Sequence, residues 1–306
     1  MDALTQEVQN LYTQYPFPNA DYRIEYGIHL LRYFSEDAPK GKKSLLENAN
    51  VLDAGCGTGN AVSRLAKQFS PSRFTAVDLT PASLEVARQN AAKLGATNIT
   101  FRNENLLTMD LGQTFDVIQN MGVLHHLSDM SAGIKNLAKH LDKNGRLILW
   151  LYGTYGRFRL NLNQAMFRIL FKNVDSLPQK VDLAKRALTT FPREWTTCHF
   201  NAPTTKIEDD FDKSLEFAFQ NEAWLVDQFL HVNEKTVNME DILKLFDAAG
   251  LQLSRWLLVS QDLESYTSDP DLIKIYRELE PRDKLLFLDL LVKPNYYLVV
   301  ARKISS

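Results

Sequence analysis

Two acidic residues flank a glycine-rich turn and could together bind a charged ligand that contains a sugar. Asp53 precedes the run Gly55-Cys56-Gly57-Thr58-Gly59, and Asp78 stands 19 residues after Gly59. Glycines allow a tight turn and a close approach of ligand to backbone. A carboxylate at Asp53 would repel a pyrophosphate but suits an ammonium, and one at Asp78 could accept from both hydroxyls of a ribose. The GxGxG spacing also differs from the GxGxxG of dinucleotide sites.

Two adjacent histidines, His125 and His126, follow the short apolar run 115–118. Histidine titrates near neutral pH, so either side chain could remove the proton from a hydroxyl nucleophile. Two other interpretations stay open: a histidine packs at a helix start and bonds the backbone, or the nucleophile is a carboxylate that needs no base. Cys56 is interpreted as a small residue that fills the turn, because the pattern predicts no base beside it.

The segments that must position these residues alternate between short apolar runs and amphipathic stretches. The expected strands are 51–54, 74–78, 99–101, 115–118 and 146–151, and the expected helices are 61–69, 81–94 and 130–141. Such alternation, with strands that are apolar almost throughout, is typical of a parallel sheet covered by helices on both faces. Ligands bind at the carboxyl ends of such strands, where Asp53, Asp78 and both histidines are expected.

The alternation stops after residue 153 and returns near the end of the chain. Residues 154–235 contain helical patterns at 158–171 and 181–191 and many aromatics; a helix at 239–249 and strands at 251–259 and 296–301 follow. We therefore expect one doubly wound α/β domain with a helical insertion, or lid, after its fifth strand. The expected parts are an N-terminal arm or cap at 1–48, a cofactor-binding core at 49–153, the insertion at 154–235, and a C-terminal part of the core at 236–306 with a second, partly helical insertion at 260–293.

This order of motifs resembles that of the class I S-adenosylmethionine-dependent methyltransferases. The similar segments are 51–59, 76–79, 103–106, 115–118, 123–127, 141–149, 239–251 and 296–303. The resemblance implies a Rossmann-like sheet of seven strands with an antiparallel last strand, S-adenosylmethionine as cofactor and S-adenosylhomocysteine as product. It places Asp53 at the methionine end, Asp78 at the ribose and Leu79 against the adenine. The full implied cofactor set is Asp53, Gly55, Cys56, Gly57, Gly59, Asp78, Leu79, Asn105, Leu106 and Asn120.

One cofactor position departs from the family pattern. Asn105 falls where many members have an Asp that accepts from the adenine amino group. The side-chain carbonyl of an asparagine can still accept one hydrogen bond. The departure weakens this single assignment without removing it.

The segment after the fourth strand indicates the class of acceptor. Residues 119–126 lack the Asn/Asp-Pro-Pro-aromatic sequence of enzymes that methylate exocyclic amines and amides. The run 123–126 instead resembles small-molecule and lipid-quinone methyltransferases, which predicts a small, apolar or aromatic acceptor and makes His125 and His126 the candidate catalytic residues. Aromatic rings in the arm and the insertion predict a pocket wall, although the arm could simply dock on the sheet and most insertion rings must form its core. The residues expected on the substrate side are Tyr15, Tyr22, Arg23, Trp195, His199 and Trp224.

Charge is nearly balanced over the chain, with 35 basic and 37 acidic side chains and a net charge of -2. Proteins that bind phosphate backbones usually carry a basic excess, so we expect no nucleic-acid partner. Arg157 and Arg159 could bind an acidic group, but charged residues beside a helix usually form a solvated face. No His, Cys and Asp cluster has the spacing of metal ligands, so no metal is expected.

Further expectations concern location and the competing functions. Two cysteines cannot form a disulfide framework, residues 1–7 do not resemble a signal peptide, and apolar runs such as 147–152 are far shorter than a membrane span. These features predict a soluble, cytoplasmic protein without membrane contact and leave the oligomeric state open. A tRNA or protein methyltransferase and a non-catalytic S-adenosylmethionine-binding protein are the alternative functions.

Overall fold

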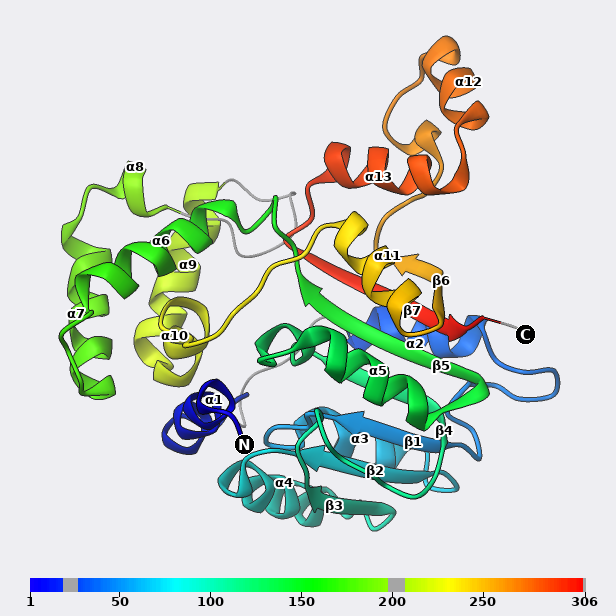
Figure 1. The fold of residues 1–306 in the computed structure, drawn as a ribbon, viewed down its shortest axis with the longest axis horizontal. Coiled ribbons are helices and arrows are strands. Elements are labelled where there is room, and N and C mark those ends of the chain that lie inside the picture. The colour runs from blue at the N-terminus through cyan, green and yellow to red at the C-terminus, as the bar shows by residue number, and fades with distance from the viewer. Residues whose placement is uncertain (19–26, 198–206, 305–306) are drawn as a thin grey trace.

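A seven-stranded sheet lies at the centre of the structure, a computed structural model that describes residues 1–18, 27–197 and 207–304 (Figure 1). The strand order is β3-β2-β1-β4-β5-β7-β6. Neighbours among β1 to β5 pair in parallel, whereas β7 runs antiparallel to both β5 and β6. The strands are β1 Asn50–Ala54, β2 Arg73–Asp78, β3 Ile99–Asn103, β4 Phe115–Met121, β5 Leu141–Tyr152, β6 Leu251–Leu257 and β7 Tyr296–Lys303.

Helices precede the sheet, cover both of its faces and fill the long connections after β5 and β6. Before β5 the helices are α1 Ala3–Gln14, α2 Gly27–Glu36, α3 Asn60–Gln68, α4 Pro81–Leu94, the 3-10 turn η1 Leu124–His126 and α5 Met130–His140. Between β5 and β6 they are α6 Phe158–Leu170, α7 Leu177–Thr190, α8 Arg193–Thr196, α9 Ile207–Gln220, α10 Glu222–Phe229 and α11 Met239–Ala248. Between β6 and β7 they are η2 Leu263–Ser265, α12 Pro270–Glu278 and α13 Pro281–Val292.

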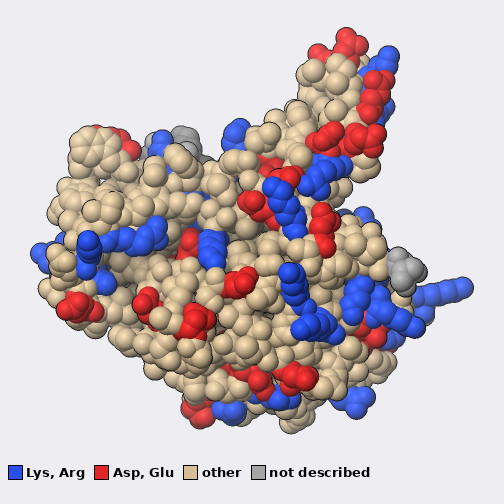
Figure 2. Space-filling model, viewed as in Figure 1, with Lys and Arg blue, Asp and Glu red and all other residues tan. Residues whose placement is uncertain are grey.

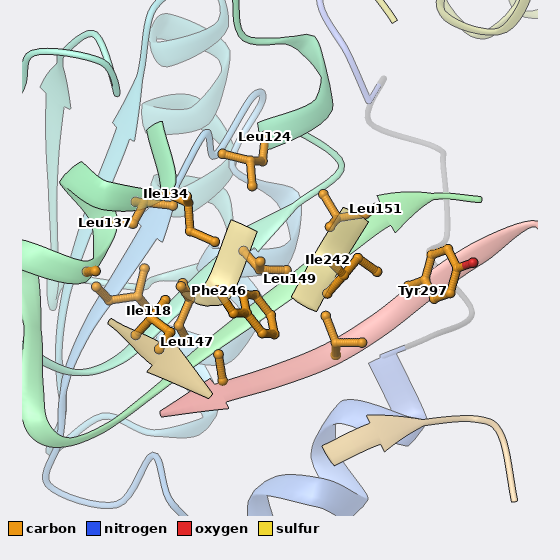
Figure 3. Packing of buried hydrophobic residues seen from close by; sticks show 14 of the residues in the cluster. Ile118, Leu124, Ile134, Leu137, Leu147, Leu149, Leu151, Ile242, Phe246 and Tyr297 are labelled. Carbon is orange, nitrogen blue, oxygen red and sulfur yellow. The ribbon is translucent and has the colours of Figure 1, made fainter. Parts of the chain in front are cut away.

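Successive residues of the strands point to opposite faces and build two cores. Leu147, Leu149 and Leu151 of β5 pack with α5 and α11 on one face (Figure 3). Ile148, between them, belongs to the core formed with α2, α3 and α4 on the other face. Because the strands are apolar on both faces, the sheet is buried between two helical layers. The predicted fold class, a Rossmann-like sheet with an antiparallel last strand and a helical insertion after the fifth strand, is confirmed.

The helices after β5 have a core of their own. Leu160 and Phe167 of α6 pack with Val181 of α7 and with Leu225 and Phe229 of α10. The amphipathic helix α1 contributes Leu11 to the same cluster and lies directly beneath the insertion in Figure 1. The N-terminal helix therefore joins the insertion to the body of the protein.

The boundary between α5 and β5 differs from the sequence prediction. The helix expected at 130–141 ends at His140 in the structure, and Leu141 opens β5, which was expected to begin at 146. Leu141 is fully buried and pairs with Phe115 before a register shift in the β4–β5 ladder. Burial of this leucine against the sheet decides its conformation, so Asn144-Gly145 lies within an irregular strand rather than at a helix end.

The segment with α12 projects from the rest of the molecule (Figure 1). Tyr276 of α12 and Leu288 of α13 anchor it in the core beneath α11. Among the described helices, none combines the length and the apolarity needed to cross a membrane. The division of the chain into parts at residues 48, 153 and 235 stays a prediction.

Candidate active site

The glycine-rich turn after β1 has the backbone conformation and the crowding that glycine serves. Gly55, Gly57 and Gly59 have φ values of 89°, 52° and 69°, which side chains other than glycine rarely adopt. A Cβ at Gly59 would lie 2.6 Å from the Cβ of Ala87 in α4, and one at Gly55 would lie 2.5 Å from the Val123 side chain. The turn is therefore closely packed against α4 and the β4 loop.

Asp78, at the end of β2, organises this turn. Its Oδ2 accepts from the backbone N–H of Gly57 at 2.8 Å, and its Oδ1 accepts from that of Thr80 at 2.9 Å. Burial raises the pKa of the Asp78 carboxyl above its usual value, while these backbone hydrogen bonds oppose the rise. Each carboxylate oxygen keeps a lone pair for a further donor, so the geometry is compatible with the predicted ribose contact.

Asp53, at the end of β1, is a buried carboxyl with no cation beside it among the described residues. It is 4% exposed, and burial raises its pKa to about 7, with a smaller contribution from the Asp78 charge. The side chain of Gln119, which opposes Asp53 in the β1–β4 register, forms a hydrogen bond with it and lowers the pKa. A cationic ligand group would relieve the cost of ionising this carboxyl, so the site fits the ammonium of S-adenosylmethionine.

The remaining predicted cofactor residues differ in what their side chains contact. Asn120 is fully buried; its Nδ2 donates to Ala54 O at 2.7 Å and its Oδ1 accepts from Leu124 N at 3.0 Å. Asn105 Oδ1 accepts from Leu107 N at 2.9 Å. Both amides hold loops at the carboxyl ends of the strands. Their cofactor contacts stay predictions.

Three apolar members of the predicted set lie beside the same loops. Leu106 is buried at the end of β3 and Leu79 is half-buried after β2. Cys56 is buried within the turn, and burial raises the pKa of its thiol well above the ordinary value, with Asp78 adding to the effect. A thiol with a raised pKa is a poor nucleophile, in agreement with a filling role.

The N-terminal arm contacts the loops that would surround a cofactor. Gln9 Nε2 in α1 donates to Leu79 O at 2.8 Å, and Thr58 Oγ1 donates to Pro18 O. A Cβ at Gly57 would lie 2.3 Å from the carbonyl oxygen of Phe17. The arm thus rests on the loops after β1 and β2. Of the arm residues expected on the substrate side, Tyr15 packs half-buried against the insertion core, whereas Tyr22 and Arg23 lie outside the described residues.

His125 and His126 lie in η1, between the sheet and the insertion. His125 is fully buried, and neither ring nitrogen has a hydrogen-bond partner among the described residues. Burial lowers its pKa well below the usual value, and the positive charges of His126 and Arg157 add to this effect. The lowered pKa favours the neutral imidazole of His125, whose ring lies 4.2 Å from that of Tyr152 between centroids.

His126 has a defined hydrogen-bonding role. Its Nδ1 lies 3.0 Å from Asn233 O, and because a carbonyl only accepts, Nδ1 donates this hydrogen bond. The ring stacks on His231 at 3.8 Å between centroids. The side-chain amide of Asn233 donates to His126 O and the backbone N–H of Lys235 donates to His125 O, and these bonds also fix the insertion here. The geometry supports an anchoring role, and the predicted role as general base stays a prediction.

Asp227 of α10 connects three parts of the chain through one buried carboxylate. It accepts from Tyr12 Oη of α1 at 2.9 Å, from Gln228 Nε2 at 2.9 Å, and from Tyr152 Oη at the end of β5 at 3.4 Å. Burial raises the pKa of Asp227, and the nearby His126 opposes the rise. Arm, sheet and insertion meet at this side chain.

His126, Asp227 and His231 come close enough to suggest a metal site that sequence spacing did not reveal. Their ligand atoms lie within 4.8 Å of one another. His231 Nδ1 accepts from Asn233 N at 3.0 Å, so its Nε2 carries the proton and faces Tyr12 Oη at 3.2 Å. A metal would have to displace that proton. The hydrogen bonds therefore place His231, Tyr12 and Asp227 in one chain, and His126 stacks on His231 beside it.

Arg157 is not on a solvated face. Its side chain is 3% exposed and its Nη2 lies 2.9 Å from Glu234 Oε1, with Glu234 1% exposed. The guanidinium stacks 3.5 Å above the Tyr152 ring and donates to Gln228 Oε1 at 3.2 Å. The solvated-face interpretation is wrong for Arg157 because the insertion covers it, whereas Arg159 is exposed as that interpretation requires.

A group of aromatic residues that the sequence analysis did not single out lies at the carboxyl end of the central strands. Trp150 and Tyr296 are both half-buried, with ring centroids 5.3 Å apart, and Trp150 lies 4.9 Å from Tyr152. Trp150 pairs with Met121 of β4, two residues beyond the pairing of Asp53 with Gln119. We name Met121, Trp150, Tyr152 and Tyr296 the aromatic wall. In the sequence, Trp150 and Tyr296 lie within the strands expected at 146–151 and 296–301, and no local spacing marks them as part of a binding site.

The residues of the insertion that were expected on the substrate side do not belong to the aromatic wall. Trp224 is 7% exposed and packs inside the insertion core, whereas Trp195 of α8 is 75% exposed. His199 lies outside the described residues. The structure does not bring Trp195 or Trp224 into contact with the predicted cofactor residues, and their substrate-side roles stay predictions.

Comparison with known proteins agrees with this geometry. The sequence model of a family described as "Methyltransferase domain" matches residues 45–217, more than half of the chain. An uncharacterized protein of Synechococcus sp. is 26% identical over 82% of this chain and 59% of its own length. Malonyl-[acyl-carrier protein] O-methyltransferase of Bacillus cereus is 29% identical over 46% of this chain and 52% of its own length. The chain thus spans between half and three fifths of the length of these relatives.

A solved structure shares the fold over most of the chain. PKMT2 from Rickettsia typhi, in complex with AdoHcy, superposes with a TM-score of 0.61 at 19% identity and covers 84% of this chain and 49% of its own. The chain belongs to the methyltransferase-domain family. Its sheet also has the seven strands and the antiparallel last strand that the resemblance to the class I S-adenosylmethionine-dependent methyltransferases implied.

Proposed function

We propose that this methyltransferase acts on a small, apolar or aromatic molecule that binds against the aromatic wall. The observation that carries the proposal is the half-buried ring pair of Trp150 and Tyr296 beside Met121. Half-buried rings at the ligand edge of a Rossmann-like sheet suit an apolar acceptor. Trp224 of the insertion is instead buried in the core of the insertion.

The residues of the chain have separate tasks in this proposal. S-adenosylmethionine supplies an electrophilic methyl group when bound. Asp53 would hold its ammonium and Asp78 its ribose hydroxyls, while the arm covers the loops and excludes water. Methyl transfer is an in-line displacement, so holding acceptor and methyl in line in a dry site supplies much of the rate.

A carrier-linked acceptor is the alternative that the relatives favour. The Bacillus relative named above acts on a malonyl group attached to acyl-carrier protein. A carboxylate of that kind is itself the nucleophile and needs no base. Free and carrier-linked acyl acids therefore belong in the same substrate panel as aromatic hydroxyl compounds.

The first experiment is release of S-adenosylhomocysteine across this panel, with mass identification of the methylated product. Trp150→Ala should then raise KM for the acceptor by roughly ten-fold or more, with cofactor affinity unchanged. Trp195→Ala is the matched control, because the same side chain is lost from an exposed position. A raised KM in Trp195→Ala with a normal KM in Trp150→Ala would contradict the proposal and indicate that the acceptor binds at the insertion.

The predicted base is tested with His125→Asn and His126→Asn separately. If one histidine removes the acceptor proton, its variant should lose roughly 10²–10⁴ in turnover, and the loss should shrink at high pH, where the acceptor ionises unaided. Equal melting temperatures of variant and wild type separate this effect from the anchoring contacts of η1. Near-normal turnover in both variants would contradict the role as general base and assign both histidines a packing role.

A further inference from the structure

A cleft of about 540 Å³ lies at the edge of the sheet opposite the loops 53–59 and 78–80, which we call the cofactor loops. Its walls come from the α2–β1 connection and from the amino-terminal parts of β4 and β5, together with the last residues of β7. Asp53, Asp78 and the aromatic wall lie at the carboxyl ends of the same strands. The cleft is therefore separate from the site described above.

The lining of this cleft is predominantly basic. Only two carboxylates, those of Asp37 and Asp116, face five cations. The cations are Lys42, Lys143, Arg146, Arg302 and Lys303. The excess of three positive charges contrasts with the net charge of -2 for the whole chain. Figure 2 shows Lys and Arg side chains gathered on the side of the molecule where β7 ends.

The two arginines are held in place by one carboxylate. Arg146 Nε lies 2.6 Å from Asp37 Oδ2, and Arg302 Nη2 lies 3.0 Å from both oxygens of Asp37. Arg302 Nε is buried and has no hydrogen-bond partner among the described residues. Asp116 accepts from the backbone N–H of Asn50 at 2.8 Å and so is partly satisfied already. The two carboxylates therefore fix the walls of the cleft and leave an excess of three positive charges.

The lysines supply the remaining charge. Within the described part of the chain, Lys42, Lys143 and Lys303 have no carboxylate within salt-bridge distance; Lys42 Nζ instead donates to Glu47 O at 2.7 Å. Ammonium groups of this kind bind phosphate as point charges, whereas fixed guanidinium groups bind it through directed N–H donors. The volume falls within the range of small-molecule sites.

We propose that this cleft binds a small molecule that carries two or more phosphate groups. Three uncompensated positive charges match a di- or triphosphate better than a single carboxylate or phosphate. An extended nucleic-acid backbone is disfavoured, because the basic residues line a hollow and no basic excess continues over the chain. The proposal does not depend on the methyl acceptor.

The test measures binding of tripolyphosphate by calorimetry to the full-length protein at low and high salt. Wild type should bind it saturably, more tightly than inorganic phosphate, and more weakly as salt increases. Lys143→Gln combined with Lys303→Gln should weaken binding by about ten-fold or more, or roughly 1.4 kcal/mol. The control is Lys172→Gln combined with Lys274→Gln. It removes the same charge from two exposed positions, Lys172 after α6 and Lys274 on α12, and should change affinity less than about two-fold.

Three results would overturn the proposal. The first is no saturable binding by wild type, and the second is an equal loss in both double variants, which would indicate general charge attraction. The third is tighter binding of an oligonucleotide with the same dependence on Lys143 and Lys303, which would make the cleft a nucleic-acid surface. Unchanged melting temperatures of both variants show that binding losses do not come from unfolding.

Discussion

The cofactor loops and the junction between sheet and insertion are built in different ways. The cofactor loops use residues that are close in sequence, mainly 53–59 and 78–80, and much of their structure is backbone held by Asp78. The junction brings together Tyr12, Tyr152, Arg157, Asp227 and Glu234 from distant segments and buries their polar groups. The first region has a sequence signature because its chemistry requires fixed spacing, whereas the second forms only when the chain folds.

The largest expected effect comes from breaking the buried ion pair of the junction. Arg157→Met leaves Glu234 buried without its cation, and Glu234 Oε2 already has no hydrogen-bond partner among the described residues. Removing one member of such a pair costs about 3–5 kcal/mol in free energy of unfolding. Urea denaturation of both proteins would measure the loss.

Two further variants sharpen this prediction. Arg193→Met breaks an ion pair with Asp212 whose side chains are 50% and 56% exposed, so it should cost less than about 1 kcal/mol. Arg157→Met combined with Glu234→Met should recover part of the stability, because no unpaired charge remains. Equal losses of unfolding free energy in Arg157→Met and Arg193→Met would show that the buried ion pair contributes no more to stability than an exposed one.

The next effect concerns Asp53, the buried carboxyl of the cofactor loops. The pKa of Asp53 is about 7 in the folded protein against an ordinary 3.8, so between about pH 4 and pH 7 the folded state holds a proton that the unfolded state has lost. Stability from this group is therefore lost as pH rises through that window. Asp53→Asn should stabilise the ligand-free protein at pH 8 by about 2–4 kcal/mol relative to wild type, with little gain at pH 4.

The same substitution should weaken cofactor binding by roughly 10- to 100-fold, because the ammonium loses its charged partner. Thermal melting at pH 4 and pH 8, with and without S-adenosylhomocysteine, measures both effects. Asp110→Asn makes the same change in a side chain that is 91% exposed and should alter neither. A stabilised variant with unchanged affinity would leave Asp53 as a structural residue.

These two regions also explain which parts of the molecule the sequence predicts. Local sequence patterns predict the sheet and the cofactor loops. These patterns are the strand and helix periodicities, the glycine-rich turn and the position of Asp78, and each depends only on local spacing. The aromatic wall and the His126–Asp227–His231 trio depend on strand order and on the return of the insertion, which no local spacing encodes. Arg157 shows the same limit, since only the insertion packed over it makes it a buried charge.

A smaller effect distinguishes the two roles of Asp78. Asp78→Ala removes the acceptor for Gly57 and Thr80 as well as the predicted ribose contact, and we expect a loss of about 1–3 kcal/mol in cofactor affinity. If the carboxylate contacts the ribose, wild type should discriminate between S-adenosylhomocysteine and its 2′-deoxy analogue, and the variant should not. Equal discrimination in both proteins would restrict Asp78 to holding the turn.

The smallest effect concerns the hydrogen bonds that hold the arm at the junction. Tyr12→Phe keeps the ring in place but removes the Oη contacts to Asp227 and His231 at 2.9 and 3.2 Å. The loss should be about 0.5–1.5 kcal/mol, and it should fall on the arm more than on the sheet, because Asp227 keeps its bonds from Gln228 and Tyr152. Hydrogen exchange should therefore accelerate in residues 3–14 while protection of the central strands stays unchanged. Tyr15→Phe is the matched control, since Tyr15 packs against the insertion core without such a hydrogen bond among the described contacts. Faster exchange throughout the chain, or equal acceleration in both variants, would contradict a local role for Tyr12 and leave the arm held by apolar packing alone.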